Sequence, residues 1–382
     1  MTSSPRSLQA RRRFLLTIGG LALALAGCQT GERAVVRPVT GPPVVGPVDS
    51  GERNKVAVIV PLTGSDGALG QSIANAANMA LLDSGDKTLR LTVYSSSGGS
   101  AAAVRMAIAA GNKLILGPLL ADEVRAAAPV ARAAGVPVIA FSNDTSVAGN
   151  GVYTLGFTPD QSIERVVGLA RQRGATRFAA MVPTGLYGQR AAQAMLRVVQ
   201  ESGGRMVSIE TFNRTAAAVR TAAAGINAKG GADAILIGDA GRIAAVAAPA
   251  LKVGQRLLGT ELWAMDKTLG ATPALRGAWY AAAPDERFTQ FATRYRARYG
   301  RAPFRLSSLG YDAVLLAVRS SRNWEAGSRF PARSLADRDG FGGVDGIFRF
   351  DREGVAQRAL EVRQVTASGT TTVSPAAKTF GD

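Results

Sequence analysis

Residues 56–82 read VAVIVPLTGSDGALGQSIANAANMALL, and they give the clearest indication of the fold. The run Val56–Val60 is continuously apolar, as expected for a strand that is buried on both faces, and Pro61 ends it. Small and apolar residues then recur at the spacing of one helix face: Leu69, Ile73, Ala76, Ala77 and Ala80. The stretch therefore predicts a buried strand that leads, through a short loop, into a helix.

The same alternation continues along the chain and then starts again. Strand starts expected near residues 56, 89, 114 and 136 are echoed by starts near 177, 205, 234 and 256, with helical patterns between them. Strand and helix in strict alternation are typical of a parallel sheet covered on both faces. We therefore predict an α/β protein with two doubly wound, Rossmann-like lobes joined by a hinge.

The C-terminal third predicts elements that return to these lobes. Aromatic residues at helix spacing indicate a helix over 288–299, and a second helix is expected over 306–316. Alternating runs at 347–350 and 360–365 predict half-buried strands. We expect the helices to join the first lobe and the strands the second. The predicted domains are lobe 1, residues 54–155 plus 280–328, and lobe 2, residues 156–279 plus 340–370.

The N-terminal 53 residues indicate export and attachment. Three arginines, Arg11 to Arg13, precede an apolar run of 14 residues from Phe14 to Gly27, too short to span a bilayer and typical of a signal peptide over 1–27. The sequence Leu25-Ala26-Gly27-Cys28 resembles a bacterial lipobox. That resemblance implies lipidation of Cys28, the only cysteine, and so a membrane anchor facing the periplasm. Because Asp does not follow Cys28, the same resemblance favours attachment to the outer over the inner membrane.

Residues 28–53 are rich in proline and glycine and show no apolar periodicity. Such a composition does not bury enough surface to fold, so we predict a tether between the anchor and the body.

Composition excludes several classes of chemistry. The 382 residues include no histidine and one cysteine, which removes Ser-His-Asp triads, histidine metal ligands and cysteine pairs. We expect no enzyme activity, no cofactor and no metal site. The net charge is +17, and 38 of the 45 basic residues are arginines. Such a charge could reflect nucleic acid, anionic lipid or another polyanion as partner. We attribute it instead to arginines on solvated helix faces and expect no nucleic-acid partner.

Candidate binding residues follow the predicted strands. Ligands of open α/β sheets bind outside the carboxyl ends of the strands, so loops at those ends facing one cleft would form a pocket. An alternative for the first loop is that its hydroxyls simply cap the helix that follows. The ligand-cleft candidates are Thr63, Ser65, Pro118, Leu119, Ser142, Asn143, Tyr187 and Asp239.

Several of these stretches together resemble the leucine/isoleucine/valine-binding family. They are residues 56–82, the Gly117-Pro118 turn, residues 134–143, Tyr187-Gly188, residues 299–303, Tyr311-Asp312-Ala313 and residues 343–351. The resemblance covers nearly all of 54–370 and implies the two-lobed fold of a type I periplasmic binding protein. Within the family, the chain is most similar to penicillin-binding protein activator lipoproteins, which the lipobox and tether also suit.

The departures from the family bear on function. Members that bind amino acids usually carry Ser shortly after Gly-Pro, where this chain has Leu119-Leu120-Ala121, and Asp near the second-lobe Tyr, where it has residues 183–186. We therefore expect a non-catalytic lipoprotein that contacts a peptidoglycan synthase and regulates cell-wall synthesis. The alternative is a receptor that binds an amino acid or another small molecule in its cleft and delivers it to an ABC permease.

Overall fold

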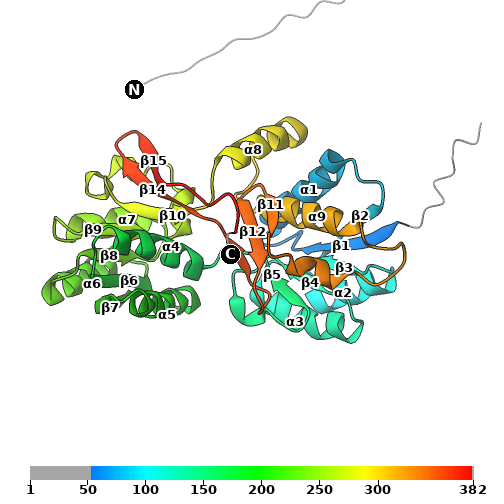
Figure 1. Cartoon of the computed structure of the whole chain (residues 1–382), viewed down its shortest axis with the longest axis horizontal. Helices are drawn as coiled ribbons and strands as arrows, with labels where there is room; N and C mark the ends of the chain where they lie inside the picture. Colours follow the sequence, from blue (N-terminus) through cyan, green and yellow to red (C-terminus); the bar gives the residue numbers. More distant parts are fainter. Residues whose placement is uncertain (1–52, 381–382) are drawn as a thin grey trace, which may run out of the picture. The chain divides into compact units, whose positions relative to one another are not determined.

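The strand predicted at Val56–Val60 lies between β2 and β3 in a five-stranded parallel sheet of the computed structural model, which describes residues 53–380 (Figure 1). The predicted signal peptide, Cys28 and the tether up to residue 52 lie outside the described residues. The strand order is β2-β1-β3-β4-β5. The strands are β1 Asn54–Val60, β2 Leu89–Ser95, β3 Leu114–Leu116, β4 Val138–Ala140 and β5 Val152–Thr154.

Helices cover both faces of this sheet. Alternate residues of β1 face opposite sides, with Val56, Val58 and Val60 in one core and Ala57 and Ile59 in the other. The helices that supply these cores are α1 Gly67–Ser84, α2 Ser100–Ala109, α3 Ala121–Ala133, α8 Glu286–Tyr299 and α9 Ser307–Ser321. Helices α8 and α9 pack with α1, so the predicted return of both helices to the first lobe is confirmed.

The second sheet repeats the same winding. Its parallel part runs β10-β9-β8-β6-β7. The first sheet, listed from the opposite edge, runs β5-β4-β3-β1-β2, so the two sheets have the same strand order. The strands are β6 Arg177–Pro183, β7 Arg205–Phe212, β8 Ala234–Ile237, β9 Arg256–Gly259 and β10 Trp279–Ala282. The helices are α4 Pro159–Gln172, α5 Leu186–Glu201, α6 Ala216–Lys229 and α7 Gly241–Ala247. The predicted two doubly wound units are therefore confirmed.

Two antiparallel strands extend the second sheet at the β10 edge. β14 Glu361–Thr366 pairs with β10, and β15 Gly369–Ser374 pairs with β14. The prediction that the strand near 360–365 belongs to the second lobe is confirmed. The predicted start of the lobe 1 segment at residue 280 is wrong, because β10 pairs with β9 and β14 through Ala282.

The predicted placement of residues 347–350 in the second lobe is also wrong. β12 Gly346–Phe350 pairs with β11 Phe341–Gly343 and β13 Ala356–Arg358 in a separate three-stranded sheet. Its inward side chains Phe348 and Phe350 belong to the core of the first sheet, where Phe350 packs edge-on against Tyr153 with ring centroids 5.2 Å apart. Hydrophobic burial against the first lobe therefore decides where this strand packs.

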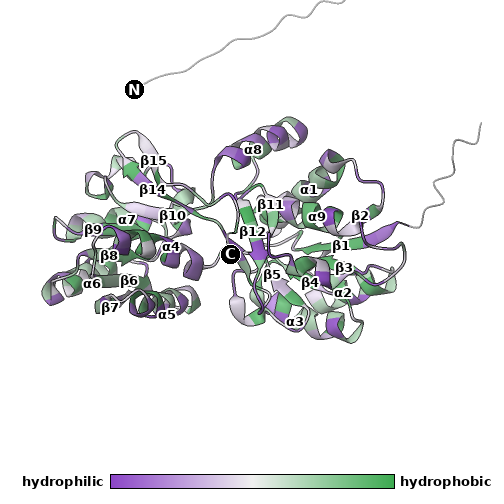
Figure 2. Ribbon diagram, in the orientation of Figure 1, coloured by the Kyte–Doolittle hydropathy of each residue, from purple (hydrophilic) through white to green (hydrophobic). Residues whose placement is uncertain are grey.

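Apolar residues follow the strands closely. Figure 2 shows the strands of both parallel sheets mostly in hydrophobic colours, while α8 is largely hydrophilic. Only Phe291 and Tyr295 of α8 are buried, so this helix is attached to α1 by a narrow aromatic stripe.

The chain crosses between the lobes three times, at residues 155–158, 283–285 and 359–360. These crossings form the predicted hinge. They lie next to the strand ends at which the candidate cleft residues are expected.

A close backbone approach recurs at the first strand of each lobe. A Cβ built on Gly70 in the first turn of α1 would lie 1.7 Å from the carbonyl oxygen of Pro61, and one on Gly188 in α5 would lie 1.6 Å from that of Pro183. Only glycine lets each helix begin this close to the end of the strand before it. The two contacts fix where the cleft-facing loops start.

We predict that Gly70→Ala and Gly188→Ala each lower the free energy of unfolding by about 2 kcal/mol or more, because the obstructing atom is backbone and cannot rotate away. Urea titration followed by circular dichroism measures the change. The matched control is Gly168→Ala in α4, where no atom lies within 4 Å of the new Cβ, and which should stabilise by up to about 1 kcal/mol. Equal effects of all three substitutions would contradict the steric explanation.

Candidate functional site

A cavity of about 260 Å³ lies where the carboxyl ends of the two parallel sheets face each other. The first lobe contributes loops after β1, β3 and β4, and the second contributes the segments after β9 and β10. Its walls are mostly apolar: Leu69, Leu119, Leu120, Phe141, Phe157, Leu262, Ala264, Met265, Ala282, Ala283 and Leu306. Four polar side chains also line it: Asp66, Asn143, Glu261 and Arg305.

Two of the eight predicted cleft residues line this cavity. Leu119 is buried in its wall, and Asn143 is exposed at its edge. Pro118 and Ser142 are buried directly beside them. The Pro118 carbonyl accepts a hydrogen bond from the N–H of Phe141, and the Ser142 hydroxyl accepts one from the N–H of Asp144, so both residues hold the loops in shape.

The first loop is arranged differently from either predicted possibility. The backbone N–H groups of Leu62 and Thr63 both donate to the hydroxyl of Ser97, at 3.1 Å, so they do not point free into the cleft. Neither Thr63 nor Ser65 caps α1, since Asp66 stands at the N-cap without a side-chain capping bond. Both hydroxyl residues are exposed, and Asp66 is the residue of this loop that lines the cavity.

Tyr187 lies next to the cavity and contacts one of its walls. Its hydroxyl lies 3.0 Å from Thr260 Oγ1 and donates to Glu261 Oε1 at 3.0 Å. Burial, together with the charge of Glu261, raises the pKa of Tyr187 well above its usual value, so the hydroxyl stays protonated and donates. The second oxygen of Glu261 accepts a hydrogen bond from Ser162 at 2.5 Å. Two hydroxyls therefore hold the Glu261 carboxyl in the cavity wall.

Asp239 lies behind the site. It is buried, its Oδ2 accepts from Arg214 Nε at 2.8 Å, and its Oδ1 accepts from the N–H of Ala240. Its carbonyl accepts the indole N–H of Trp263, a fully buried residue of the segment Glu261–Met265. Asp239 therefore does not line the cavity but supports the segment Glu261–Met265, which does.

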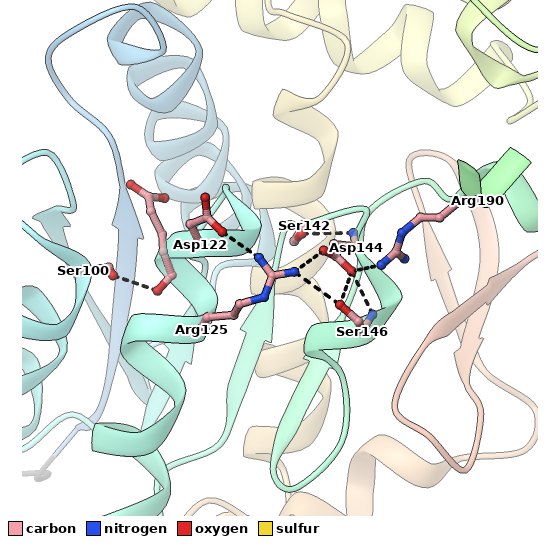
Figure 3. Close-up of polar contacts among 8 residues, drawn as sticks. Ser100, Asp122, Arg125, Ser142, Asp144, Ser146 and Arg190 are labelled. Carbon is pink, nitrogen blue, oxygen red and sulfur yellow. Dashed lines mark hydrogen bonds and ion pairs between the residues drawn. The ribbon is translucent and has the colours of Figure 1, made fainter. Parts of the chain in front are cut away.

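An ion-pair cluster joins the lobes beside the cavity (Figure 3). Asp144 of the first lobe is buried, and its carboxylate pairs with Arg190 of α5 in the second lobe and with Arg125 of α3. Arg190 also donates to Thr145 Oγ1 at 2.8 Å. Burial alone would raise the pKa of Asp144, but hydrogen bonds from Ser146 and the charges of the two arginines outweigh it and lower that pKa.

Three charged residues of the cavity wall were not predicted from the sequence: Asp66, Glu261 and Arg305. Asp66 and Glu261 follow β1 and β9, so the strand-end rule used for the other candidates could have found them. Arg305 precedes α9 in a segment with no strand before it, and nothing in the sequence marks it. In the structure it pairs with buried Asp345 and lies over the ring of Phe288 at 4.0 Å.

Within 53–380, no three or more His, Cys, Asp or Glu side chains gather in a way that could hold a metal ion. Over the same range, no helix is both long and apolar enough to cross a membrane.

Comparisons with known proteins agree with this architecture. The sequence model of the periplasmic binding protein family matches residues 54–370. A Rickettsia prowazekii protein described as uncharacterized is 23% identical over 175 residues, which are 45% of this chain and 47% of that protein. The match thus spans about half the length of that curated relative.

Solved structures show the same fold at low identity. A leucine-binding protein of Thermotoga maritima is 22% identical with a TM-score of 0.62, covering 85% of this chain and 98% of that one. A solute-binding protein of an ABC transporter from Rhodopseudomonas palustris, in complex with 3,4-dihydroxybenzoic acid, is 19% identical with a TM-score of 0.64, covering 86% and 99%. The fold is therefore that of the type I periplasmic binding proteins. Because the family's sequence model matches residues 54–370, most of the 382 residues, the chain belongs to the periplasmic binding protein family.

Proposed function

We propose that the protein is an exported receptor that binds a small, largely apolar molecule between its lobes and delivers it to an ABC permease. The observation that carries the proposal is the cavity of about 260 Å³, to which both lobes contribute wall residues. Apolar walls with a few placed polar groups are typical of small-molecule sites. Membership of a family of ligand binders supports a binding rather than a catalytic role and a periplasmic location.

The attachment to a membrane is part of the same proposal. A lipidated Cys28 would hold the receptor on the bilayer, and the tether over 28–53 would let the body reach a permease. Intact mass measurement of the native protein tests this step, since an unmodified Cys28 thiol would contradict it.

The regulator of peptidoglycan synthesis is the less supported candidate. The ABC transporter protein named above favours the receptor, and a largely apolar cavity between the lobes has no evident use in a protein that acts only through a synthase contact. The lost family groups around Leu119 argue against an amino acid as ligand, but not against a ligand of another class.

We expect a thermal-shift screen of the full chain against amino acids, aromatic acids, amines and neutral apolar compounds to yield stabilising ligands. A ligand at about 100 times its Kd adds about 2.7 kcal/mol to the stability, which raises Tm by several degrees. Asn143→Trp, which places an indole at the cavity edge, should abolish the shift. Gln200→Trp, at an exposed position of α5, is the matched control and should keep it.

Two results together would contradict the receptor function and support the regulator of peptidoglycan synthesis. They are a screen in which no compound stabilises the chain, and capture of a peptidoglycan synthase by both tryptophan variants.

The ion pair between Asp144 and Arg190 bears on how such a receptor closes. The side chains are 3% and 16% exposed, so they are shielded from salt, and hydrogen bonds to charged groups contribute about 1.5–3 kcal/mol. Asp144 keeps Arg125 as a second partner, so losing Arg190 does not leave a buried charge unpaired. The contact therefore favours lobe closure even without ligand.

We predict that Arg190→Met shifts the ligand-free protein toward an open arrangement, visible as a larger radius of gyration in small-angle X-ray scattering. The expected loss of about 1.5–3 kcal/mol lowers the closed-to-open ratio by about 10- to 150-fold. Arg197→Met is the matched control, because Arg197 lies on the same helix but pairs with Asp160 and Glu201 inside its own lobe. Identical scattering from the wild type and Arg190→Met would show that closure does not depend on this pair.

A further inference from the structure

A second pocket, of about 450 Å³, lies on the second lobe away from the cavity between the lobes. It is formed by the end of α4 and the loop that follows, by the residue before β8, and by the residues at the start of β9 and β10. These are the amino ends of parallel strands, whereas the cavity lies at their carboxyl ends. The two sites therefore lie at opposite edges of the same sheet.

Two arginines of this pocket have no acidic partner. Arg173 follows the last turn of α4, and Arg256 is the first residue of β9. Both residues are exposed, and among residues 53–380 neither takes part in an ion pair. Two positive charges are therefore available to a ligand in the pocket.

Contacts within the protein hold Arg256 in place. Its guanidinium lies over the ring of Trp279, 4.4 Å from the centroid, and donates to the carbonyl of Gly277. Trp279 is itself fixed, because it is only 6% exposed and its indole N–H donates to Gln364 Oε1 at 3.0 Å. A side chain that is already ordered loses less conformational freedom when it binds a ligand. Arg256 is therefore a preorganised cation.

The acid of the pocket wall, Asp233, does not cancel these charges. Its Oδ2 accepts from the backbone N–H groups of Thr176 and Arg177, each at 2.8 Å, and its Oδ1 pairs with the Arg177 guanidinium at 3.2 Å. The Thr176 hydrogen bond, together with those from Arg177, outweighs burial and lowers the pKa of Asp233 to about 2. The ionised carboxylate is thus matched by Arg177, which leaves Arg173 and Arg256 unmatched.

Charge and size together indicate the class of ligand. The planar guanidinium group of arginine presents paired N–H donors that match the oxygens of a phosphate. A phosphate monoester carries about −1.5 to −2 charges at pH 7, which suits two arginines, whereas a single carboxylate carries one. Small-molecule sites have volumes of roughly 300–1,000 Å³, so this pocket has room for an organic group beside the phosphate. Ala170 and Ala175 supply apolar wall for that group.

We propose that this pocket binds the phosphate group of an organic phosphate monoester, with Arg173 and Arg256 as its cationic partners. The inference goes beyond the proposed receptor function and does not depend on it, because the two sites share no lining residue. Two sources carry the same chemistry, a soluble ester and the headgroup of a phosphatidic acid.

Isothermal titration of the full chain at pH 7.5 tests the charge class with glycerol 3-phosphate, glycerol and acetate. We expect glycerol 3-phosphate to bind at least about tenfold more tightly than acetate, equivalent to about 1.4 kcal/mol, and glycerol to give no heat. The affinity for the ester should fall as salt is added, since the arginines are exposed.

A fourth probe, dihexanoyl phosphatidic acid below its micellar concentration, separates the two sources. Tighter binding of this probe than of glycerol 3-phosphate would assign the pocket to a lipid headgroup. Tighter binding of glycerol 3-phosphate would assign it to a soluble ester. Either result supports the phosphate site.

Substitutions test the assignment to the two arginines. Arg256→Met keeps an apolar side chain against Trp279 and removes the cation, and Arg173→Met removes the other cation. Each should weaken glycerol 3-phosphate binding about tenfold or more, while a thermal melt checks that the fold persists. Arg220→Met, at an exposed position of α6 outside the pocket, removes the same charge and should change the affinity less than twofold.

Four results would overturn the inference. They are failure of both phosphate probes to bind, acetate binding as tightly as the ester, equal affinities of Arg220→Met and the two pocket variants, and loss of ester binding in Asn143→Trp. The last result would locate the ester in the cavity between the lobes. None of the four removes the receptor function, which the thermal-shift screen tests separately.

Discussion

Two buried arginines, Arg358 and Arg363, connect the three segments by which the chain passes between its lobes. Arg358, beside the third crossing, donates to the carbonyl of Leu155 in the first at 2.6 Å. Arg363 donates to the carbonyl of Ala283 in the second at 2.7 Å and pairs with Asp285. Backbone carbonyls in a crossing have no strand partner, so these bonds satisfy groups that burial would otherwise leave unpaired.

The position of the cavity follows from this arrangement. Phe157 and Ala283 belong to the crossings and also line the cavity, so a ligand bound there would touch the segments about which the lobes would move. The guanidinium of Arg358 lies over Phe157 at 4.5 Å, which connects the same wall to the buried charges behind it. Burial lowers the pKa of Arg358, and the neighbouring carboxylates Asp345 and Asp312 oppose that effect. A change in hinge angle would therefore disturb both apolar contacts and buried ion pairs.

The sequence predicted the parallel sheets well because buried strands are continuous apolar runs, and the predicted starts near 89, 114, 205 and 234 match the observed strands. It missed β5 and β10, although β3 and β8 are equally short, because β3 and β8 are continuous aliphatic runs while β5 and β10 contain Tyr, Thr, Trp and Ala. It misplaced β12 because alternation shows that a strand has one buried face but not which core covers that face. The basic composition was also interpreted incompletely, because not all arginines are solvated. Arg190 forms an ion pair between the lobes, and Arg358 and Arg363 are buried at the crossings.

The site was predictable only where position along a strand decides it. Leu119 and Asn143 lie at strand ends and reach the cavity, whereas Asp239, equally placed, turns to Arg214. The direction of a polar side chain depends on partners far away in sequence, and one sequence alone does not show them.

A cavity residue and a residue of the ion pair between the lobes are neighbours in the chain. Asn143 lines the cavity and directly precedes Asp144, which pairs with Arg190. An ion pair that favours the closed form lets the ligand bind lobes that are already arranged, so less of its binding energy goes into closing them. Where this contact has to open before a ligand enters between the lobes, it also slows association. In the receptor proposed above, a strong Asp144–Arg190 pair would thus raise affinity and lower the rate of exchange together. In the proposed receptor, this combination would suit a ligand that is scarce.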